Sequence, residues 1–286
     1  MRAVSCGRLS FSVLVVSNYD VIVRTANFLH MLRTPQKYSD SFVEALANGL
    51  RAIEVFDTGG RSLTLTEVAE RAGLSRAASR RYLHTLCALG YAEHDGKRFK
   101  LTPRVLKLGY VFISTGPLPQ LAQPILEGIV AATGMPAFLG VLDGLDVAFI
   151  ARASPQSETL LVGVGGRLPA FTSSSGRVLL AAKRDAEIER MIRRAGRPRQ
   201  VTLYTKTETA DILREIQVAR TSGYATSDKE VAVGSRSISV PVMTPSGSVA
   251  AAIALVAPAR TSATAKSLQQ ALPMLQRASQ ALGSLL

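Results

Sequence analysis

Two short amphipathic segments that meet at Gly73 constrain the fold of this chain more than any other feature. The first begins near Thr66 and stops at Gly73, and the second follows Ser75 and continues to Leu89. Threonine and serine favour helix starts because their hydroxyls accept hydrogen bonds from free backbone amides. Glycine permits the left-handed turn between two helices. The pattern predicts a helix-turn-helix, whose second helix enters the major groove of DNA.

The second of these helices separates apolar from cationic side chains. At about 100° per residue, its predicted apolar face carries Ala78, Tyr82, Leu86 and Leu89, with Leu83 at the edge. The opposite face and the helix start supply the side chains that we expect to contact bases or phosphates: Ser75, Arg76, Ala77, Arg80, Arg81 and His84. Arginine suits guanine because its planar fork matches two acceptors on the base edge. A solvated basic helix face is the alternative interpretation.

One residue of this helix departs from the expected pattern. Ser79 occupies a position at which helix-turn-helix motifs normally bury an aliphatic side chain.

The segment after Gly90 predicts a β-hairpin. Asp95-Gly96 is a strong turn signal within residues 91–101. A hairpin here is the wing of a winged helix-turn-helix, and its cations are candidates for phosphate contacts: Lys97, Arg98 and Lys100. Such contacts orient a protein on DNA without reading its sequence. Ordinary surface cations are the alternative.

Glycine, proline and changes of pattern divide the chain into four parts. We interpret residues 1–38 as a leader that is disordered or results from a misassigned start, since Met31 is an equally good first residue. We assign residues 39–102 to the winged helix-turn-helix, residues 103–116 to a linker helix that begins at a Thr-Pro pair, and residues 117–286 to a larger domain.

The larger domain alternates helical and strand-like patterns, which predicts an α+β fold with a mixed sheet flanked by helices. Helices are expected over residues 121–133, 176–183, 185–195, 208–222 and 268–282, and strands over residues 137–141, 147–153, 160–164, 237–243 and 249–256.

Charge and cysteine content limit the class of protein. The formal charge is +13, with 16 basic and 9 acidic residues in 1–115, and 18 and 12 in 116–286. Such a balance favours polyanionic partners. Two cysteines, Cys6 and Cys87, allow neither a disulfide framework nor a thiolate-rich metal site and fit a reducing cytosol. No apolar run reaches the roughly 18–20 residues of a membrane span. We expect a cytoplasmic protein without membrane contact, metal or cofactor.

An enzyme and an architectural DNA-binding protein are the alternatives to a regulator. His30, His84 and His94 all precede residue 116, and the larger domain has no cysteine, so it lacks the commonest groups for proton transfer and thiol chemistry. The glycine-rich residues 163–167 lack the lysine and hydroxyl residue of a phosphate-binding loop. We therefore expect no catalytic residues. An architectural protein would cover DNA broadly, whereas a regulator protects a short palindromic site.

Several motifs in the same order resemble the IclR family of bacterial transcription regulators. They are FVEALANGLR (42–51), AGLSRAASRRYL (72–83), LGY (89–91), GRLPA (166–170), SGRVLLA (175–181), GYATSDKE (223–230) and GSRSISVPV (234–242). Residues 101–110, LTPRVLKLGY, are similar to the branch that controls aromatic-acid breakdown through protocatechuate and β-ketoadipate. The resemblance covers about residues 40–286.

The resemblance implies a sequence-specific regulator whose output depends on a small aromatic or dicarboxylic acid. It implies a GAF-like second domain with effector-binding residues at the matching positions: Leu160, Ser174, Ser175, Gly176, Ser227, Asp228, Ser235 and Ser237. Hydroxyls and backbone amides at a helix start suit an anion. Ser227 and Ser237 replace an acid and a cysteine of some members. Leu160 and Leu161 fit an apolar wall or strand core, and Arg236 fits either the ligand carboxylate or Glu230.

The expected assembly follows from the size of the DNA-binding unit. One winged helix reads few bases, so we expect a homodimer or a dimer of dimers on a pseudo-palindromic operator. The linker helix, residues 103–114, is the candidate dimer contact because its apolar side exceeds what its own domain needs. RNA polymerase is a further candidate partner. The sequence leaves open whether transcription is activated or repressed, which operator is read, and which acid is sensed.

Overall fold

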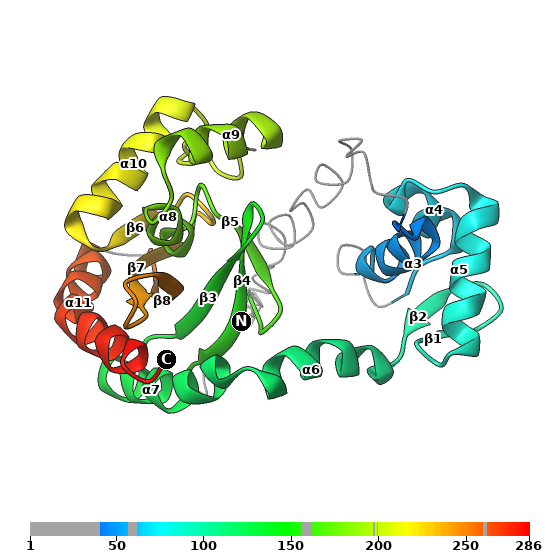
Figure 1. The fold of residues 1–286 in the computed structure, drawn as a ribbon, viewed down its shortest axis with the longest axis horizontal. Coiled ribbons are helices and arrows are strands. Elements are labelled where there is room, and N and C mark those ends of the chain that lie inside the picture. Colours follow the sequence, from blue (N-terminus) through cyan, green and yellow to red (C-terminus); the bar gives the residue numbers. More distant parts are fainter. Residues whose placement is uncertain (1–40, 57–61, 156–161, 197, 199, 260–261) are drawn as a thin grey trace, which may run out of the picture.

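The computed structural model describes residues 41–56, 62–155, 162–196, 198, 200–259 and 262–286. The predicted leader lies outside these residues. The described chain forms a small N-terminal part and a larger C-terminal part joined by two consecutive helices (Figure 1). The N-terminal part contains α3 (Glu44–Glu54), α4 (Leu65–Ala72), α5 (Arg76–Ala88), β1 (Ala92–His94) and β2 (Phe99–Leu101).

Three helices and a hairpin share one core in the N-terminal part. Strands β1 and β2 pair antiparallel, and Leu63 forms an isolated antiparallel bridge with Phe99. Leu63, Val68 and Leu83 are fully buried in this core, with Phe99 beside them. The hairpin is therefore anchored to the helices through Phe99, which fixes the wing next to the helix-turn-helix.

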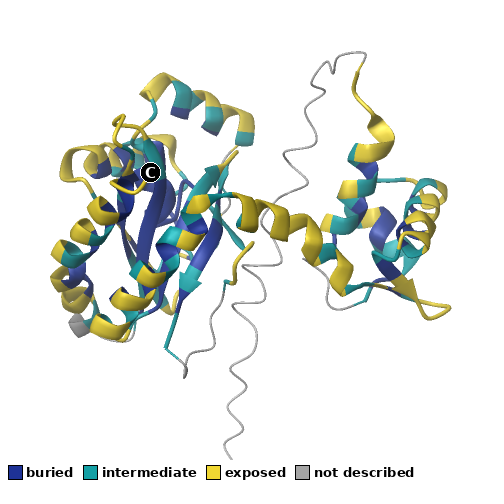
Figure 2. Ribbon diagram, turned by 60° about the horizontal axis from the view of Figure 1, so that its bottom comes forward, coloured by how far each residue is buried: buried dark blue, intermediate teal, exposed yellow. Residues whose placement is uncertain are grey.

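The connection between the two parts is helical and unusually exposed. It consists of the 3₁₀ turn η1 (Pro103–Val105) and α6 (Leu106–Thr115), and it leads into α7 (Pro117–Thr133), which packs on the sheet of the C-terminal part. Gly116 separates α6 from α7 with an extended backbone conformation. None of the residues of α6 is buried, and Figure 2 shows this helix almost wholly in the colour of exposed residues. α7 begins at Pro117, four residues before its predicted start at 121.

A six-stranded antiparallel sheet forms the centre of the C-terminal part. Its strand order is β5-β4-β3-β8-β7-β6. The strands are β3 (Ala137–Asp143), β4 (Asp146–Ala153), β5 (Arg167–Pro169), β6 (Ala225–Asp228), β7 (Ser235–Met243) and β8 (Val249–Pro258). The α+β class is confirmed, but every pairing between these strands is antiparallel, so the expected mixed strand direction is wrong.

Two predicted details of the sheet differ from the structure. Residues 162–164, the described end of the predicted strand 160–164, are not in a strand, and β5 follows instead. β6 was not predicted because Ala225-Thr-Ser-Asp228 is short and polar.

Helices cover both faces of the sheet (Figure 1). α7 and α11 (Ser262–Gly283) cover one face, and α8 (Ser174–Leu180) lies on the other. α10 (Thr209–Ser222) packs on α8 and β6, and α9 (Asp185–Ala195) packs on α10. Side chains of β7 alternate accordingly: Ile238, Val240 and Val242 enter the core below α7 and α11, whereas Ser237 and Ser239 face α8. This alternation places hydroxyls beneath the start of α8.

None of the described helices combines the length and the apolar character that a membrane crossing requires.

Candidate DNA-binding surface and effector site

Side-chain caps fix the starts of α4 and α5, and a glycine forms the turn between the two helices. Thr64, not Thr66 as predicted, caps α4: the Glu67 amide donates to Thr64 Oγ1 at 3.3 Å, and the Thr64 amide donates to Glu67 Oε2 at 2.7 Å. This reciprocal capping box was visible in the sequence as Thr-x-x-Glu. Gly73 has φ 64°, which confirms the left-handed turn. Ser75 caps α5 as predicted, because its Oγ accepts from the Ala78 amide at 3.2 Å.

The cationic face of α5 is exposed as predicted. Ser75 and the five expected contact residues of α5 are all exposed: Arg76, Ala77, Arg80, Arg81 and His84. The His84 ring forms a T-shaped contact with the Phe99 ring of β2, with 6.0 Å between the ring centroids. The three arginines of this face are exposed, so a planar guanidinium can meet a base edge.

The buried face of α5 is turned relative to the prediction. Ser79, Leu83 and Leu86 are buried, whereas Leu89 is 53% exposed and lies at the C-cap. The contact surface follows the spacing i, i+4 and i+7, with a small residue where α5 approaches its neighbours. The Ser79 hydroxyl is fully buried and finds no hydrogen-bond partner within the described parts of the chain.

The wing is a tight hairpin held by Asp95. The amides of Lys97 and Arg98 donate to Asp95 Oδ1 at 2.9 and 2.7 Å. These hydrogen bonds lower the pKa of the Asp95 carboxyl, and the one from the Arg98 amide contributes most. His94 stacks on Phe99 with a centroid distance of 4.2 Å.

The three predicted phosphate contacts of the wing differ in their surroundings. Arg98 Nη1 donates to the Ser62 carbonyl at 2.8 Å and lies 3.7 Å from Glu67. Lys100 pairs with Glu93 at 2.9 Å. Lys97 is exposed at the turn. Arg98 and Lys100 thus hold the hairpin together, and Lys97 is the wing cation best placed for phosphate.

In the C-terminal part, three of the predicted effector residues form the buried start of α8. Ser173 caps the helix, since its Oγ accepts from the Gly176 amide at 3.1 Å. Ser174 and Ser175 are each 2% exposed. A Cβ at position 176 would lie 2.0 Å from the Ala170 carbonyl oxygen, so this position requires glycine. The start of α8 therefore packs closely against the backbone of Ala170.

A cluster of hydroxyls joins α8 to β7. Ser174 Oγ lies 2.7 Å from Ser237 Oγ and 2.8 Å from Ser239 Oγ, and Ser175 Oγ lies 3.1 Å from Ser239 Oγ. Ser239 was not predicted, although its spacing of two residues from Ser237 places both on one face of a strand. Hydroxyls both donate and accept hydrogen bonds, so the cluster suits a ligand with carboxylate and hydroxyl groups.

The other predicted effector residues lie at β6 and at the start of β7. Ser227 is buried and donates through Oγ to the Thr172 carbonyl at 2.9 Å. Asp228 pairs with Arg236 at 2.7 Å on the surface, so the suggested pairing of Arg236 with Glu230 is wrong. Ser235 is half-buried. Leu160 and Leu161 lie outside the described residues.

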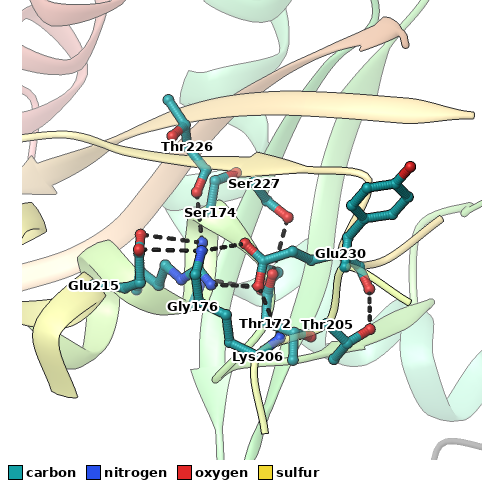
Figure 3. A network of polar contacts seen from close by, with 12 residues as sticks. Thr172, Ser174, Gly176, Thr205, Lys206, Glu215, Thr226, Ser227 and Glu230 are labelled. Atoms are coloured by element: carbon teal, nitrogen blue, oxygen red, sulfur yellow. Dashed lines mark hydrogen bonds and ion pairs between the residues drawn. The ribbon is translucent and has the colours of Figure 1, made fainter. Parts of the chain in front are cut away.

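A buried ion-pair network beside this site was not predicted (Figure 3). Arg177 is 1% exposed and pairs with Glu230 at 2.7 Å and with Glu215 at 3.7 Å. Lys206 completes the network, 3.1 Å from Glu215 and 3.3 Å from Glu230. The available signal was an arginine within the apolar helical run SGRVLLA, which demands a buried acidic partner.

Comparison with known proteins agrees with this arrangement. The model of the IclR helix-turn-helix domain matches residues 45–96, and the model of the bacterial transcriptional regulator IclR C-terminal domain matches residues 112–284. The Pca regulon regulatory protein of Pseudomonas putida is 39% identical over 74% of this chain and 73% of its own length. The p-hydroxybenzoate hydroxylase transcriptional activator of Acinetobacter baylyi is 35% identical over 86% of this chain and 93% of its own length.

A solved structure resembles the C-terminal part. It is the inducer-binding domain of the PobR transcription factor from Acinetobacter, a double mutant in complex with 3-hydroxybenzoic acid. It is 31% identical with a TM-score of 0.54 and covers 59% of this chain and 99% of that one. An exposed basic helix in a helix-turn-helix and a C-terminal effector domain are thus combined in one molecule, and the chain belongs to the IclR family of bacterial transcriptional regulators.

Proposed function

We propose that this protein controls transcription in response to an aromatic acid that binds at the start of α8. The observation that carries the proposal is a cluster of hydroxyls at this helix start, in which Ser174, Ser175 and Ser239 are buried and Ser237 is half-buried. These hydroxyls hydrogen-bond to one another, and each can donate as well as accept, so a carboxylate together with a ring hydroxyl can join or replace these hydrogen bonds. Relatives named for the Pca regulon and for p-hydroxybenzoate hydroxylase support this ligand class.

On the DNA side, the proposal assigns base contacts to Arg76, Arg80 and Arg81 of α5. These side chains are exposed on one helix that is capped and packed on its opposite face. Ser75, Ala77 and His84 flank them, and Lys97 of the wing takes a phosphate. Arg98 and Lys100 contribute positive charge while they keep their internal pairs.

We further propose that the active form is a homodimer whose interface includes α6, because apolar side chains are exposed around the whole circumference of this helix. Leu106, Tyr110 and Phe112 are 74%, 67% and 59% exposed. Leu46 and Leu50 of α3 are exposed as well. A soluble protein rarely leaves so many large apolar side chains uncovered, and a two-fold dimer places two α5 helices on the two halves of a palindrome. The compartment of such a regulator is the cytoplasm.

The test combines ligand binding with footprinting. Isothermal titration of the full chain with 4-hydroxybenzoate, 3-hydroxybenzoate and protocatechuate is expected to give saturable binding by at least one acid. The same acid should change the affinity for DNA from the region upstream of the gene, where the protein protects a short palindromic site. Broad protection that no acid alters would indicate an architectural DNA-binding protein instead.

A further inference from the structure

The proposed effector site is assembled from two segments that are distant in sequence. One is the start of α8, with Ser174 and Ser175, and the other comprises β6, the turn of residues 229–234 and the start of β7. The hydroxyl contact between Ser174 and Ser237 spans 63 residues of chain. A ligand held by both segments is sensitive to their relative position, because hydrogen bonds tolerate only a few tenths of an ångström.

Arg177 connects these two segments one helical turn after Ser174. Its Nη1 donates to the Thr226 carbonyl of β6 at 2.7 Å, and its Nη2 donates to Glu230 Oε2 at 2.7 Å (Figure 3). Both ends of the pair are buried, with side-chain exposures of 1% and 3%. A planar guanidinium with two short charged or polar contacts fixes direction as well as distance.

Glu230 is also held by Thr205 and Lys206, in the loop before α10. Its carboxylate accepts from the Lys206 amide and from Lys206 Nζ, each at 3.3 Å. Its backbone carbonyl accepts from Thr205 Oγ1 at 2.7 Å. The loop before α10 thereby fixes the position of Glu230.

The backbone next to Glu230 is strained. Lys229 has φ 61°, a left-handed conformation found at no other non-glycine residue that the structure describes. Its carbonyl accepts from Thr202 Oγ1 at 2.7 Å, and its Nζ lies 5.1 Å from the Tyr204 ring centroid. Such strain persists only when the surroundings over-determine the conformation, and it concentrates at functional sites.

The network is poorly suited to a purely stabilising role. Arg177 Nε is buried and finds no hydrogen-bond partner among the described residues. Buried ion pairs often contribute no more stability than apolar residues of similar volume, and conformational specificity is one reason to retain them. The Arg177 guanidinium lacks one hydrogen-bond partner among the described residues and lies between the two segments of the proposed site. It therefore fits a role in conformational specificity better than one in stability.

We propose that Arg177 and Glu230 are positioning residues that set the distance between the two halves of the effector site and thereby the affinity for the acid. The inference rests on the proposed function, because it assumes that the acid binds between these halves. Neither side chain is required to touch the ligand.

The test compares two variants with a matched control in the full-length protein. Glu230→Gln keeps the volume and one acceptor but removes the charge, and Arg177→Met removes the guanidinium. The control is Arg220→Met: Arg220 also bridges elements, through the carbonyls of Ala181 and Lys183 and the carboxylate of Asp185. Calorimetry measures Kd for 4-hydroxybenzoate, 3-hydroxybenzoate, protocatechuate and, as a neutral analogue, 4-hydroxybenzamide.

Each variant of the pair is expected to raise the Kd of the acid about tenfold and to raise that of the amide as well, because both ligands are held between the two halves of the site. The double variant should lose no more than the stronger single variant, because one interaction is removed in each case. Arg220→Met should lower Tm while leaving Kd unchanged. A loss of stability alone would lower Tm without raising Kd, as long as the variant stays folded at the assay temperature.

The outcomes separate the inference from the function beneath it. If the wild type binds the acid and Glu230→Gln binds it with unchanged Kd, the positioning role is wrong and the effector site stands. If Arg177→Met does not fold, Glu230→Gln decides the matter alone. Absence of binding by the wild type overturns the aromatic-acid proposal and this inference with it.

Discussion

The Oγ atoms of Ser174 and Ser237 lie 2.7 Å apart, although one residue starts a helix and the other lies in a strand 63 positions later. The contact joins α8 to β7 at the end of the sheet where β6 also terminates. The start of α8 therefore contacts β7 through hydroxyls rather than apolar side chains, and this polarity distinguishes the proposed effector site from the surrounding core.

Substitution of Ser175 by a bulky residue should abolish binding of the acid while binding to the operator remains. In Ser175→Leu the added side chain has no free space, because Ser175 is 2% exposed and lies 3.1 Å from Ser239. We expect calorimetry to detect no aromatic-acid binding, whereas operator affinity in a gel-shift assay stays within about twofold because the DNA-binding part is untouched. Ser246→Leu, at the exposed tip between β7 and β8, is the control. Normal ligand binding by Ser175→Leu would contradict the assigned site.

Arg80 and Lys97 should contribute differently to DNA binding: Arg80 to the preference for the operator sequence, and Lys97 to the affinity for any DNA. Arg80→Ala is expected to cost about 1–3 kcal/mol on the operator and to relax preference at one base position. Lys97→Ala should weaken operator and random DNA alike and reduce the salt slope by about one. Fluorescence anisotropy on both DNAs across a salt series separates these effects. An equal loss for Arg80→Ala on the two DNAs would rule out base reading by Arg80.

Sequence periodicity located the helices but not their rotation or their partners. The predicted helices 185–195 and 208–222 correspond to α9, Asp185–Ala195, and α10, Thr209–Ser222, since a long amphipathic pattern survives small errors of register. In α5, the count of apolar residue types favoured a face containing Leu89, whereas the helix buries Ser79. Residue type alone does not reveal where close approach of helices demands a small side chain.

The proposed effector site was predicted only in part, for a different reason. Ser175 and Ser237 lie within motifs that resemble a family, and Ser174 directly precedes one of them, so their proximity could be expected. Arg177 and Glu230 pair across 53 positions, and a single sequence contains no information about such a distance. Their identity as partners emerges only when α8 and β6 are placed side by side in the fold.

Charge on the exposed face of α6 should impair assembly. Phe112→Glu replaces a side chain that is 59% exposed, so the isolated chain should fold normally, but an apolar interface would have to bury an unpaired carboxylate. Analytical ultracentrifugation is expected to show a dimer for the wild type and a monomer for the variant at micromolar concentration. Val218→Glu, on the exposed side of α10 with 54% exposure, is the control and should stay dimeric. A dimeric Phe112→Glu variant would exclude α6 from the interface.

Two glycines within helices should respond oppositely to alanine. At Gly176 a Cβ would lie 2.0 Å from the Ala170 carbonyl oxygen, so Gly176→Ala should destabilise the protein by roughly 1–3 kcal/mol or more. At Gly128 in α7 a Cβ meets nothing within 4 Å, and Gly128→Ala should stabilise by about 0.5–1 kcal/mol because alanine restricts the unfolded chain. Urea denaturation measures both. Equal effects of the two substitutions would show that the packing of α8 against Ala170 is looser than described.

Removal of the buried hydroxyl in α5 should increase stability. Ser79 is fully buried, and its Oγ has no hydrogen-bond partner in the part of the chain that the structure describes. An unsatisfied buried hydroxyl costs about 1–3 kcal/mol, and alanine adds about 0.5 kcal/mol of helix propensity. Ser79→Ala should therefore raise the Tm of the DNA-binding part, measured by differential scanning calorimetry, without changing operator affinity, because the side chain points away from the arginines. Ser79→Val tests whether this position has room for a larger side chain. Valine stabilises the protein only if α5 can move outward to make room for it. A lower Tm for Ser79→Ala would mean that the hydroxyl has a partner, such as a bound water, which stabilises the turn.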